Sequence, residues 1–337
     1  MATHEFEGFV LRPVTAADAV AVTNVINSVS QEFSGIDEET AEEVQEFWQT
    51  PGIDMQNDIR VLVSPTGEVM GYAEAIAWNE VPVNPYIFQR VQPALIGTPQ
   101  HGLLLDWVIE RCKDALARVP EELRVAIGMH SLADIPAQGA LLTSRGFKVM
   151  RHLFEMAADF TEEPAAATWP EGITLRPFDA ERDLADVYRA HEEAFSDHFG
   201  HVDEEFESGL KRFRHLLVES NEFDKDLWFV AVSGDEVAGY LVGRKKPHED
   251  GHLGWVNILG VRRPWRKHGL GLALLLHSFG EFYRRGWMRA ELDVDASSLT
   301  GAVRLYERAG MRVVRRHERY ELELRPGKEL MTTEAQN

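Results

Sequence analysis

The sequence predicts a mixed α/β (α+β) fold built from two related domains in tandem. Three short motifs occur twice, in the same order, separated by about half of the 337-residue chain. Within the second copy, runs of β-branched and aromatic residues alternate with segments whose apolar residues recur at helical spacing. A chain of this length is also long enough for two domains that each bury a full core.

The repeated motifs locate the two copies. They are LRP at 11–13 and 175–177, EVMGY at 68–72 and EVAGY at 236–240, and RGFKV at 145–149 and AGMRV at 309–313. Between the copies, residues 161–172 contain two prolines, small residues and acids, without a hydrophobic period. We therefore expect domains over 1–160 and 173–337, joined by a linker over 161–172.

The second copy gives the expected elements in chain order. A first strand covers 175–178, and Asp179 or a neighbour caps a helix that ends near Phe195. The turn Ser-Gly-Asp separates two strand-like runs and predicts a hairpin. The remaining segments are strands over 228–232, 236–243, 254–261 and 289–294, helices over 271–284 and 301–309, and a final hairpin or strand pair over 312–324. In the longer helix, the expected apolar positions are Leu272, Leu275, Leu276, Phe279 and Tyr283.

Composition excludes several classes of protein. With 35 Lys and Arg against 55 Asp and Glu, the net charge of −20 would repel a nucleic-acid backbone. The single cysteine, Cys112, can form no intramolecular disulfide and is expected to be a reduced thiol that acts as a small apolar side chain on a helix. The N-terminus lacks the pattern of a signal peptide, and no apolar run is long enough to span a bilayer. We expect a cytoplasmic protein that binds neither nucleic acid nor membrane.

The segment VRRPWRKHGLGL at 261–272 is the part of the sequence that indicates a ligand site. A strand ends at Val261, a basic loop follows, and Gly269 and Gly271 open an amphipathic helix. Glycines let a polyanion approach the backbone, where the free N–H groups of the first helical turn and the helix dipole attract it. We predict a pyrophosphate site, against the simpler alternative of a helix start with a solvated basic turn. A Rossmann loop is disfavoured by the distance of the glycines from the strand, and a Walker A loop is excluded by its missing Gly-Lys-Ser/Thr.

This segment resembles the Arg/Gln-x-x-Gly-x-Gly/Ala motif of the GNAT N-acetyltransferase superfamily. The segment AVRLYERAGM at 302–311 is similar to that superfamily's Ala-x-x-Leu-Tyr-x-x-x-Gly-Phe signature. The resemblance is close over about 173–325 and looser over 9–158, and tandem GNATs such as the mycothiol synthases are known. It implies two GNAT-like domains, each with a mixed, largely antiparallel central sheet flanked by helices, and acetyl-CoA as co-substrate.

The resemblance also implies roles for matching residues. Main-chain groups at the end of the strand would pair with the pantetheine amides, and the loop would cradle the pyrophosphate. Tyr306 would protonate the departing thiolate, a step for which a positioned acid is worth roughly 10²–10⁴-fold. The implied cofactor-binding residues are Leu259, Gly260, Val261, Arg266, Lys267, His268, Gly269, Leu270, Gly271 and Leu272.

Some positions depart from the family's pattern. Trp255 stands where many relatives carry the glutamate that acts as general base. Five carboxylates remain open as substitutes, directly or through water: Asp293, Asp295, Glu192, Glu193 and Asp197. In the first copy, GTPQHG at 97–102 keeps only Gly102 of the glycine pair, and Leu142 replaces Tyr306. We expect that copy to be degenerate in turnover.

The segment HEEAFSDHFGH at 191–201 has three histidines among acids, residue types that can bind a metal ion. Its histidine spacings fit no common site on one helix, so a solvated or acceptor-lining helix end is the preferred interpretation and no metal is expected.

Together these features predict an acetyltransferase acting on a primary amine of a small molecule from the second domain, in a chain that could form a homodimer. The alternatives are a CoA-binding or small-ligand-binding protein without a base, a mycothiol-synthase-like enzyme with one dedicated sugar-cysteine amine, and a protein-lysine acetyltransferase.

Overall fold

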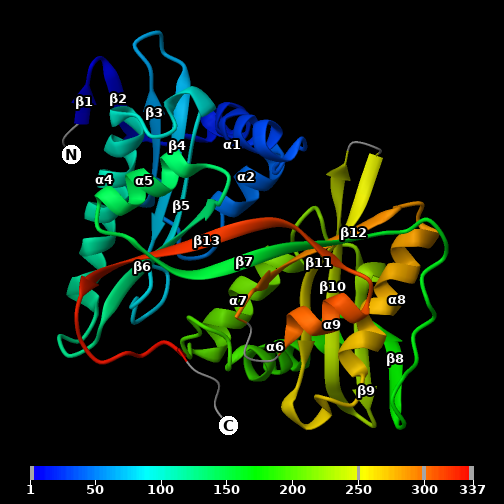
Figure 1. Cartoon of the computed structure of the whole chain (residues 1–337). Coiled ribbons are helices and arrows are strands. Elements are labelled where there is room, and N and C mark those ends of the chain that lie inside the picture. Colours follow the sequence, from blue (N-terminus) through cyan, green and yellow to red (C-terminus); the bar gives the residue numbers. More distant parts are fainter. Residues whose placement is uncertain (1–3, 249–250, 298–300, 334–337) are drawn as a thin grey trace. The chain divides into compact units, whose positions relative to one another are not determined.

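The computed structural model describes residues 4–248, 251–297 and 301–333. Its residues divide into two compact units (Figure 1). The first contains residues 1–151 and 317–330, and the second contains residues 152–316 and 331–337. The mixed α/β class with sheets flanked by helices is confirmed. Among the described residues, no helix combines the length and apolar character needed to cross a bilayer.

The first unit contains a five-stranded antiparallel sheet in the order β1-β2-β3-β4-β5. The apolar faces of α1 and α2 cover one side of it around Tyr72 and Trp48. The faces of α4 and α5 pack on the other side around Leu104 and Leu142. Its elements are β1 (His4–Phe6), β2 (Phe9–Pro13), α1 (Ala19–Ser34), α2 (Ala41–Trp48), α3 (Met55–Asp58), β3 (Ile59–Val63), β4 (Val69–Ile76), β5 (Tyr86–Val91), α4 (Pro99–Lys113), β6 (Val125–Leu132) and α5 (Pro136–Ser144).

The second unit has the strand order β7-β12-β11-β10-β9-β8. One face packs against α8 and α9 around Leu274 and Phe279, and the other packs against α6 and α7 around Tyr188 and Phe213. Its elements are β7 (Lys148–Asp159), β8 (Ile173–Pro177), α6 (Ala180–Phe195), α7 (Phe206–Leu217), β9 (Trp228–Ser233), β10 (Glu236–His248), β11 (Gly251–Val261), α8 (Leu270–Arg284), β12 (Arg289–Asp295) and α9 (Ala302–Arg308). The last strand, β13 (Arg312–Arg325), begins in this unit, and from His317 on it belongs to the first unit. Short 3-10 turns are η1 (Ala16–Asp18), η2 (Pro93–Leu95), η3 (Asp114–Arg118), η4 (Lys225–Leu227) and η5 (Arg263–Trp265).

The last strand of each sequence repeat completes the other repeat's unit. The first repeat ends in β7, whose residues from Leu153 to Asp159 pair antiparallel with β12. The second repeat ends in β13, whose residues from His317 to Arg325 pair antiparallel with β6. The expected limits 1–160 and 173–337 therefore describe the repeats, whereas the compact units divide at other positions.

The expectation of a hairpin or strand pair over 312–324 is wrong. These residues form one strand of 14 residues, β13. The segment contains no Gly, Pro, Asn or Asp that would favour a tight turn, and its residues from His317 to Arg325 pair with β6 as one extended strand.

Candidate active site

The loop between β11 and α8 leaves the start of the helix open. Gly269 is the N-cap residue of α8 and has a φ of 88°, a conformation that favours glycine. No side chain caps the first turn. A Cβ built on Gly269 would have nothing within 4 Å, so a ligand can reach the backbone there. The first N–H groups of a 15-residue helix are thus free to bind an anion.

Gly271 lies where the start of α8 packs closely against α9, the helix that contains Tyr306. A Cβ at Gly271 would lie 3.2 Å from Cδ2 of Leu305 on α9 and 3.7 Å from Cγ2 of Val261 on β11. Tyr306, the next residue on α9, is 9% exposed, and burial raises its pKa to about 12. Its hydroxyl has no hydrogen-bond partner among the described residues. The phenol is thus a protonated donor close to the loop.

Strands β11 and β12 diverge beside this helix start. They are parallel, and within the described chain their register pairs only Gly254 with Ala290 and Trp255 with Glu291. Both strands continue, β11 to Val261 and β12 to Asp295. On its other side, β11 pairs with β10 and carries a bulge at Asn257, where the register shifts. The edge of β11 that contains Leu259, Gly260 and Val261 is therefore open on the β12 side.

Three loop arginines are held by two carboxylates at the end of α6. Arg262 donates from Nε to Glu193 at 2.6 Å. Asp197 is 4% exposed and accepts from Arg263 Nη2 at 2.6 Å and from Arg266 Nη1 at 2.7 Å. Burial alone would raise the pKa of Asp197, but the hydrogen bonds from Arg266 and Arg263 outweigh it and lower that pKa. Glu193 and Asp197 are therefore structural partners of the loop, and the guanidinium of Arg266 faces α6.

The corresponding helix start in the first unit is closed by the protein itself. Thr98 caps α4 by accepting from the amide of His101. The His101 ring accepts the amide of Gly97 at 3.1 Å through Nδ1. A Cβ on Gly102 would lie 2.7 Å from Nη2 of Arg145. Side chains thus occupy the positions that remain open around Gly269.

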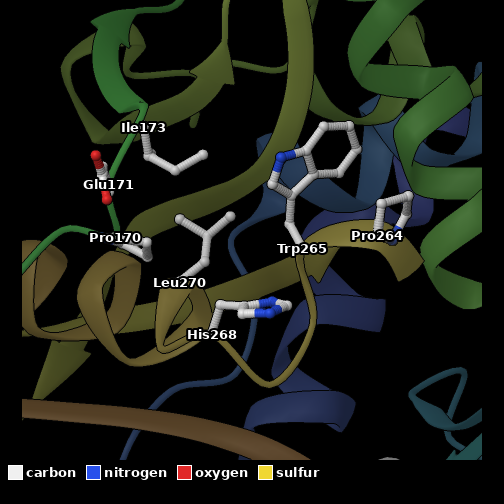
Figure 2. A pocket seen from close by; sticks show the side chains of 7 residues that line it. All are labelled: Pro170, Glu171, Ile173, Pro264, Trp265, His268 and Leu270. Carbon is white, nitrogen blue, oxygen red and sulfur yellow. The ribbon is translucent and has the colours of Figure 1, made fainter.

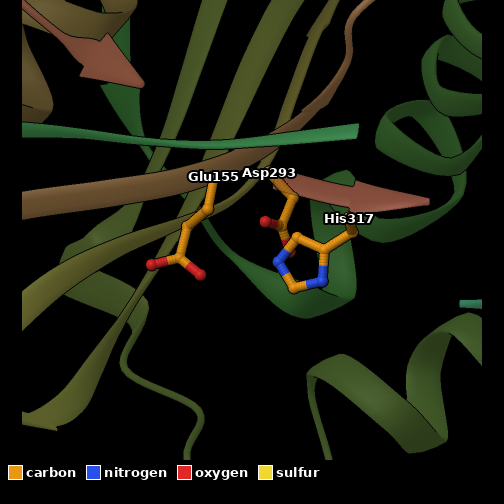
Figure 3. A group of neighbouring side chains, drawn as sticks. All are labelled: Glu155, Asp293 and His317. Carbon is orange, nitrogen blue, oxygen red and sulfur yellow. The ribbon is translucent and has the colours of Figure 1, made fainter. Parts of the chain in front are cut away.

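Of the remaining carboxylates, Asp293 lies on β12, the strand from which β11 diverges. Asn257 and Asp293 each lie two residues beyond the last register pair, on opposite sides of the divergence. Asp293 is exposed and pairs in register with Glu155 of β7. Figure 3 shows these two side chains leaving the sheet on the same side, and it also draws His317, the first residue of β13 that belongs to the first unit. Asp295 accepts the amide of Ser297 at 2.8 Å.

Glu192 lies on α6 beside Tyr188. Burial raises its pKa, which is the direction that suits a general base working near neutral pH. The nearby histidine segment engages protein partners: Nδ1 of His191 lies 2.6 Å from the hydroxyl of Tyr240, and Nε2 of His201 lies 3.1 Å from Asp203.

Trp255 has a partner that sequence reasoning missed. The ammonium of Lys246 on β10 lies 3.9 Å from the centre of the Trp255 ring. The hairpin-like pairing of β10 with β11 sets these residues close together, and no short motif in the sequence signals it. A cation stacked on an indole therefore occupies the position at which many relatives carry a base.

Comparisons with known proteins identify the family of this chain. The Acetyltransferase (GNAT) family matches residues 184–311. A mycothiol acetyltransferase of Streptomyces scabiei is 31% identical over 300 residues, covering 88% of this chain and 89% of that protein. The chain belongs to the GNAT acetyltransferase family.

Solved structures extend the likeness to the whole chain. The crystal structure of a GCN5-related N-acetyltransferase from Sphaerobacter thermophilus is 34% identical, has a TM-score of 0.76, and covers 97% of this chain and 99% of that one. A tandem GNAT protein from the clavulanic acid biosynthesis pathway shares the fold at 14% identity, with a TM-score of 0.70, and covers 95% of this chain and all of that one. This GNAT protein is thus a tandem acyltransferase, which confirms the tandem that the repeats predicted and the acyltransferase that the resemblance implied.

Proposed function

We propose that the second unit transfers an acetyl group from acetyl-CoA to a primary amine of a small molecule. The observation that carries the proposal is the difference between the two helix starts. The start of α8 at Gly269 is uncapped and open, next to the buried phenol of Tyr306. The start of α4 is capped by Thr98 and crowded by Arg145, and Leu142 stands in place of the phenol. We therefore expect each chain to bind one molecule of the acyl donor.

Different residues of the second unit bind the donor, accept the proton of the amine and protonate the leaving group. Main-chain N–H groups at Gly269 and Gly271 bind the pyrophosphate, and the open edge of β11 pairs with the pantetheine amides. Asp293 takes a proton from the amine as its nitrogen attacks the thioester carbonyl carbon. As the C–S bond breaks, Tyr306 gives its proton to the departing sulfur.

The position of Trp255 favours a second candidate, binding of acyl-CoA without turnover. The usual glutamate is absent, and the indole is covered by Lys246. The name of the Streptomyces scabiei relative suggests a third candidate, mycothiol acetyltransferase activity on a dedicated amine. All three candidates require the same donor site; they differ in whether the acyl group is transferred and in the acceptor.

Calorimetric titration of the purified chain with acetyl-CoA tests the donor site, with stoichiometry as the first readout. We expect one site per chain. Turnover is then followed by release of free thiol with a panel of polyamines, amino sugars, a cysteine-linked amino sugar and a lysine peptide.

Release of thiol with a small amine supports the proposal. Tight binding without thiol release across the panel supports a binding protein, and release with the cysteine-linked amino sugar alone supports the dedicated enzyme. Two sites, or none, would overturn the assignment of the donor site.

A further inference from the structure

The first unit contains a buried carboxylate that the proposed reaction does not use. Glu74 on β4 is 4% exposed, and its Oε1 accepts a hydrogen bond from the hydroxyl of Tyr72. That hydroxyl accepts the indole N–H of Trp48 at 2.7 Å, so its own proton is committed to Glu74. The pocket of about 470 Å³ drawn in Figure 2 adjoins the loop before α8 and belongs to the proposed donor site of the second unit.

The fold does not require a carboxylate at this position. The repeated motifs align Tyr72 with Tyr240, and two residues further on they align Glu74 with Val242, which is 3% exposed. Both positions lie on the second strand of a hairpin, β3–β4 in the first unit and β9–β10 in the second. A buried valine stabilises the core, whereas a buried carboxylate without a paired charge is costly. Packing alone therefore does not account for Glu74.

Glu74 forms no ion pair with a cation among the described residues. Arg90 on β5 is directed elsewhere: its guanidinium lies 4.5 Å from the centre of the Phe88 ring and 3.4 Å from the carboxylate of Glu38. Oε2 of Glu74 accepts no hydrogen bond from the part of the chain that the structure describes. A ligand that supplies a positive charge and an N–H donor would complete this carboxylate.

Three aromatic side chains form a cluster that is open to solvent. The rings of Trp78 and Tyr86 stack, with their centres 5.3 Å apart and an angle of 20° between their planes. Phe47 on α2 contacts both, at 6.4 and 6.0 Å between ring centres. Tyr86 is 37% exposed, and Phe47 and Trp78 are half-buried. Such rings can contact the aliphatic part of a ligand and attract a cation.

The sheet register sets this cluster beside Glu74. On β5, Phe88 pairs with Glu74 and Tyr86 pairs with Ile76, so Glu74 and Tyr86 are diagonal neighbours on one face of the sheet. Burial is the largest cause that raises the pKa of Tyr86, and the charge of Glu74 is the next. The carboxylate therefore lies close to the phenol.

Glu38 and Glu39 add negative charge next to the cluster. The backbone amides of both donate to Oδ1 of Asn27 on α1, at 2.9 and 3.0 Å, which fixes this segment. After burial and Glu74, the charges of Glu39 and Glu38 also raise the pKa of Tyr86. Aromatic rings beside carboxylates favour a positively charged organic ligand over a neutral or anionic one.

We propose that this face of the first unit binds a primary aliphatic ammonium, with its nitrogen donating to Glu74 and its aliphatic part lying against Tyr86 and Trp78. Because Glu74 is 4% exposed, a slender, unbranched ammonium fits better than a bulky one. The proposal does not depend on the donor site of the second unit. It gives the first unit a ligand of its own, although the start of α4 is closed by side chains.

Titration of the full-length protein with butylammonium, followed by NMR of the ligand, tests the proposal. At pH 8 butylammonium should bind at least about tenfold more tightly than 1-butanol, which lacks the charge, because charge-assisted hydrogen bonds are the stronger ones. It should also bind more tightly than tetramethylammonium, which has no N–H to donate.

The affinity should rise with pH. Burial raises the pKa of Glu74 to about 8, so about 1% of the carboxyl is ionised at pH 6 and about half at pH 8, while butylammonium stays charged. Binding should strengthen roughly fiftyfold between these pH values. The titratable groups that act on Glu74 are Tyr72 on its own strand, Glu39 before α2 and Arg90 on β5.

Two pairs of variants locate the site. Glu74→Gln should bind butylammonium at least about tenfold more weakly at pH 8 and lose the pH dependence, whereas Glu42→Gln, on the exposed face of α2, should retain both. Tyr86→Ala should weaken binding several-fold, and Tyr86→Phe should not. The unfolding transition of each variant shows that it is folded.

Three results would overturn the proposal. The first is equal affinity for butylammonium and 1-butanol, and the second is affinity that does not change with pH. The third is binding that survives in Glu74→Gln and is lost in Asp293→Asn, which would place the amine in the second unit. None of these results bears on whether acetyl-CoA binds at Gly269.

Discussion

The guanidinium of Arg266 donates to the carboxylate of Asp197 at 2.7 Å and thereby fixes the loop to α6. The same guanidinium also donates to the carbonyls of Val261 and Ala194 at 3.0 and 2.9 Å. Arg266, to which the motif resemblance assigns a place at the pyrophosphate, thus holds the loop in shape, and in the proposed donor site main-chain groups bind the ligand.

Removing the charge of Asp197 should destabilise the second unit. In Asp197→Asn, two arginines lose a buried charged acceptor, so the free energy of unfolding should fall by about 1–3 kcal/mol. Denaturant titration measures this change. The control Asp186→Asn breaks only the exposed pair with Arg189 and should stay within about 0.5 kcal/mol of the wild type. Equal effects of the two variants would contradict the structural role of Asp197.

A negative charge at Gly269 should abolish donor binding. Gly269→Asp places a carboxylate against the pyrophosphate, and like charges in contact cost several kcal/mol, which is roughly a hundredfold or more in affinity. Gly269→Asn is the matched control, because asparagine has nearly the same shape and also tolerates a positive φ. Calorimetry should find acetyl-CoA binding in Gly269→Asn and in Gly102→Asp but not in Gly269→Asp. If both Gly269→Asp and Gly269→Asn lost acetyl-CoA binding, backbone strain and not charge repulsion would be the cause.

Tyr306→Phe should separate chemistry from binding. The variant keeps the buried ring and loses only the proton donor, so kcat should fall by roughly 10²–10⁴-fold while the Kd for acetyl-CoA stays within about twofold. Because burial raises the pKa of Tyr306 to about 12, its contribution should persist through pH 9. Tyr283→Phe on α8 serves as control. Unchanged kcat in Tyr306→Phe would exclude this residue as the acid.

Asp293→Asn should alter the pH dependence of turnover. If Asp293 accepts the proton of the amine, kcat/KM at pH 7 should fall about a hundredfold and the acidic limb of the pH profile should disappear. Asp235→Asn, in the turn between β9 and β10, should leave the profile intact. An unchanged profile in Asp293→Asn would point instead to Glu192.

Glu74 should make the stability of the protein depend on pH. It is 4% exposed, accepts a hydrogen bond from Tyr72, and burial raises its pKa to about 8 from an ordinary value of 4.5. An acid whose pKa is raised in the folded state stabilises that state fully below pH 4.5 and loses this contribution as the pH rises through 8. The slope should approach about 1.4 kcal/mol per pH unit. Glu74→Gln should flatten this part of the unfolding curve, and Glu42→Gln, on the exposed face of α2, should not.

The local elements of the second unit were largely predictable from its sequence. The strand at 254–261, the helix over 271–284 and the short helix over 301–309 correspond to β11, α8 and α9. Their spacing and flanking glycines are local signals. The expected apolar face of α8 was partly wrong, because Leu274 and Phe282 are fully buried whereas Leu272, Leu276 and Tyr283 are only partly buried.

The pairing of the strands and the ion pairs of the candidate site depend on contacts between distant segments, so the sequence did not predict them. Pairing of β7 with β12 and of β13 with β6 joins residues more than a hundred positions apart, and no local period encodes such partners. The sequence likewise did not show which residues pair with Asp197, because it offered five acids as candidate bases. Only the fold shows that arginines bind the carboxylates of Glu193 and Asp197. It also shows that Asp293 and Asn257 lie equally far beyond the last register pair of their strands.

The reciprocal completion of the two units constrains how the chain folds during synthesis. The first unit needs residues 317–330, which are synthesised more than 160 residues after Arg151, the last residue of its other segment. Until then, β6 lacks its antiparallel partner, and β7 must wait for β12. Cleavage at 161–172 before folding would leave each fragment without a strand that its sheet requires. Neither repeat therefore supplies all the strands of a compact unit by itself.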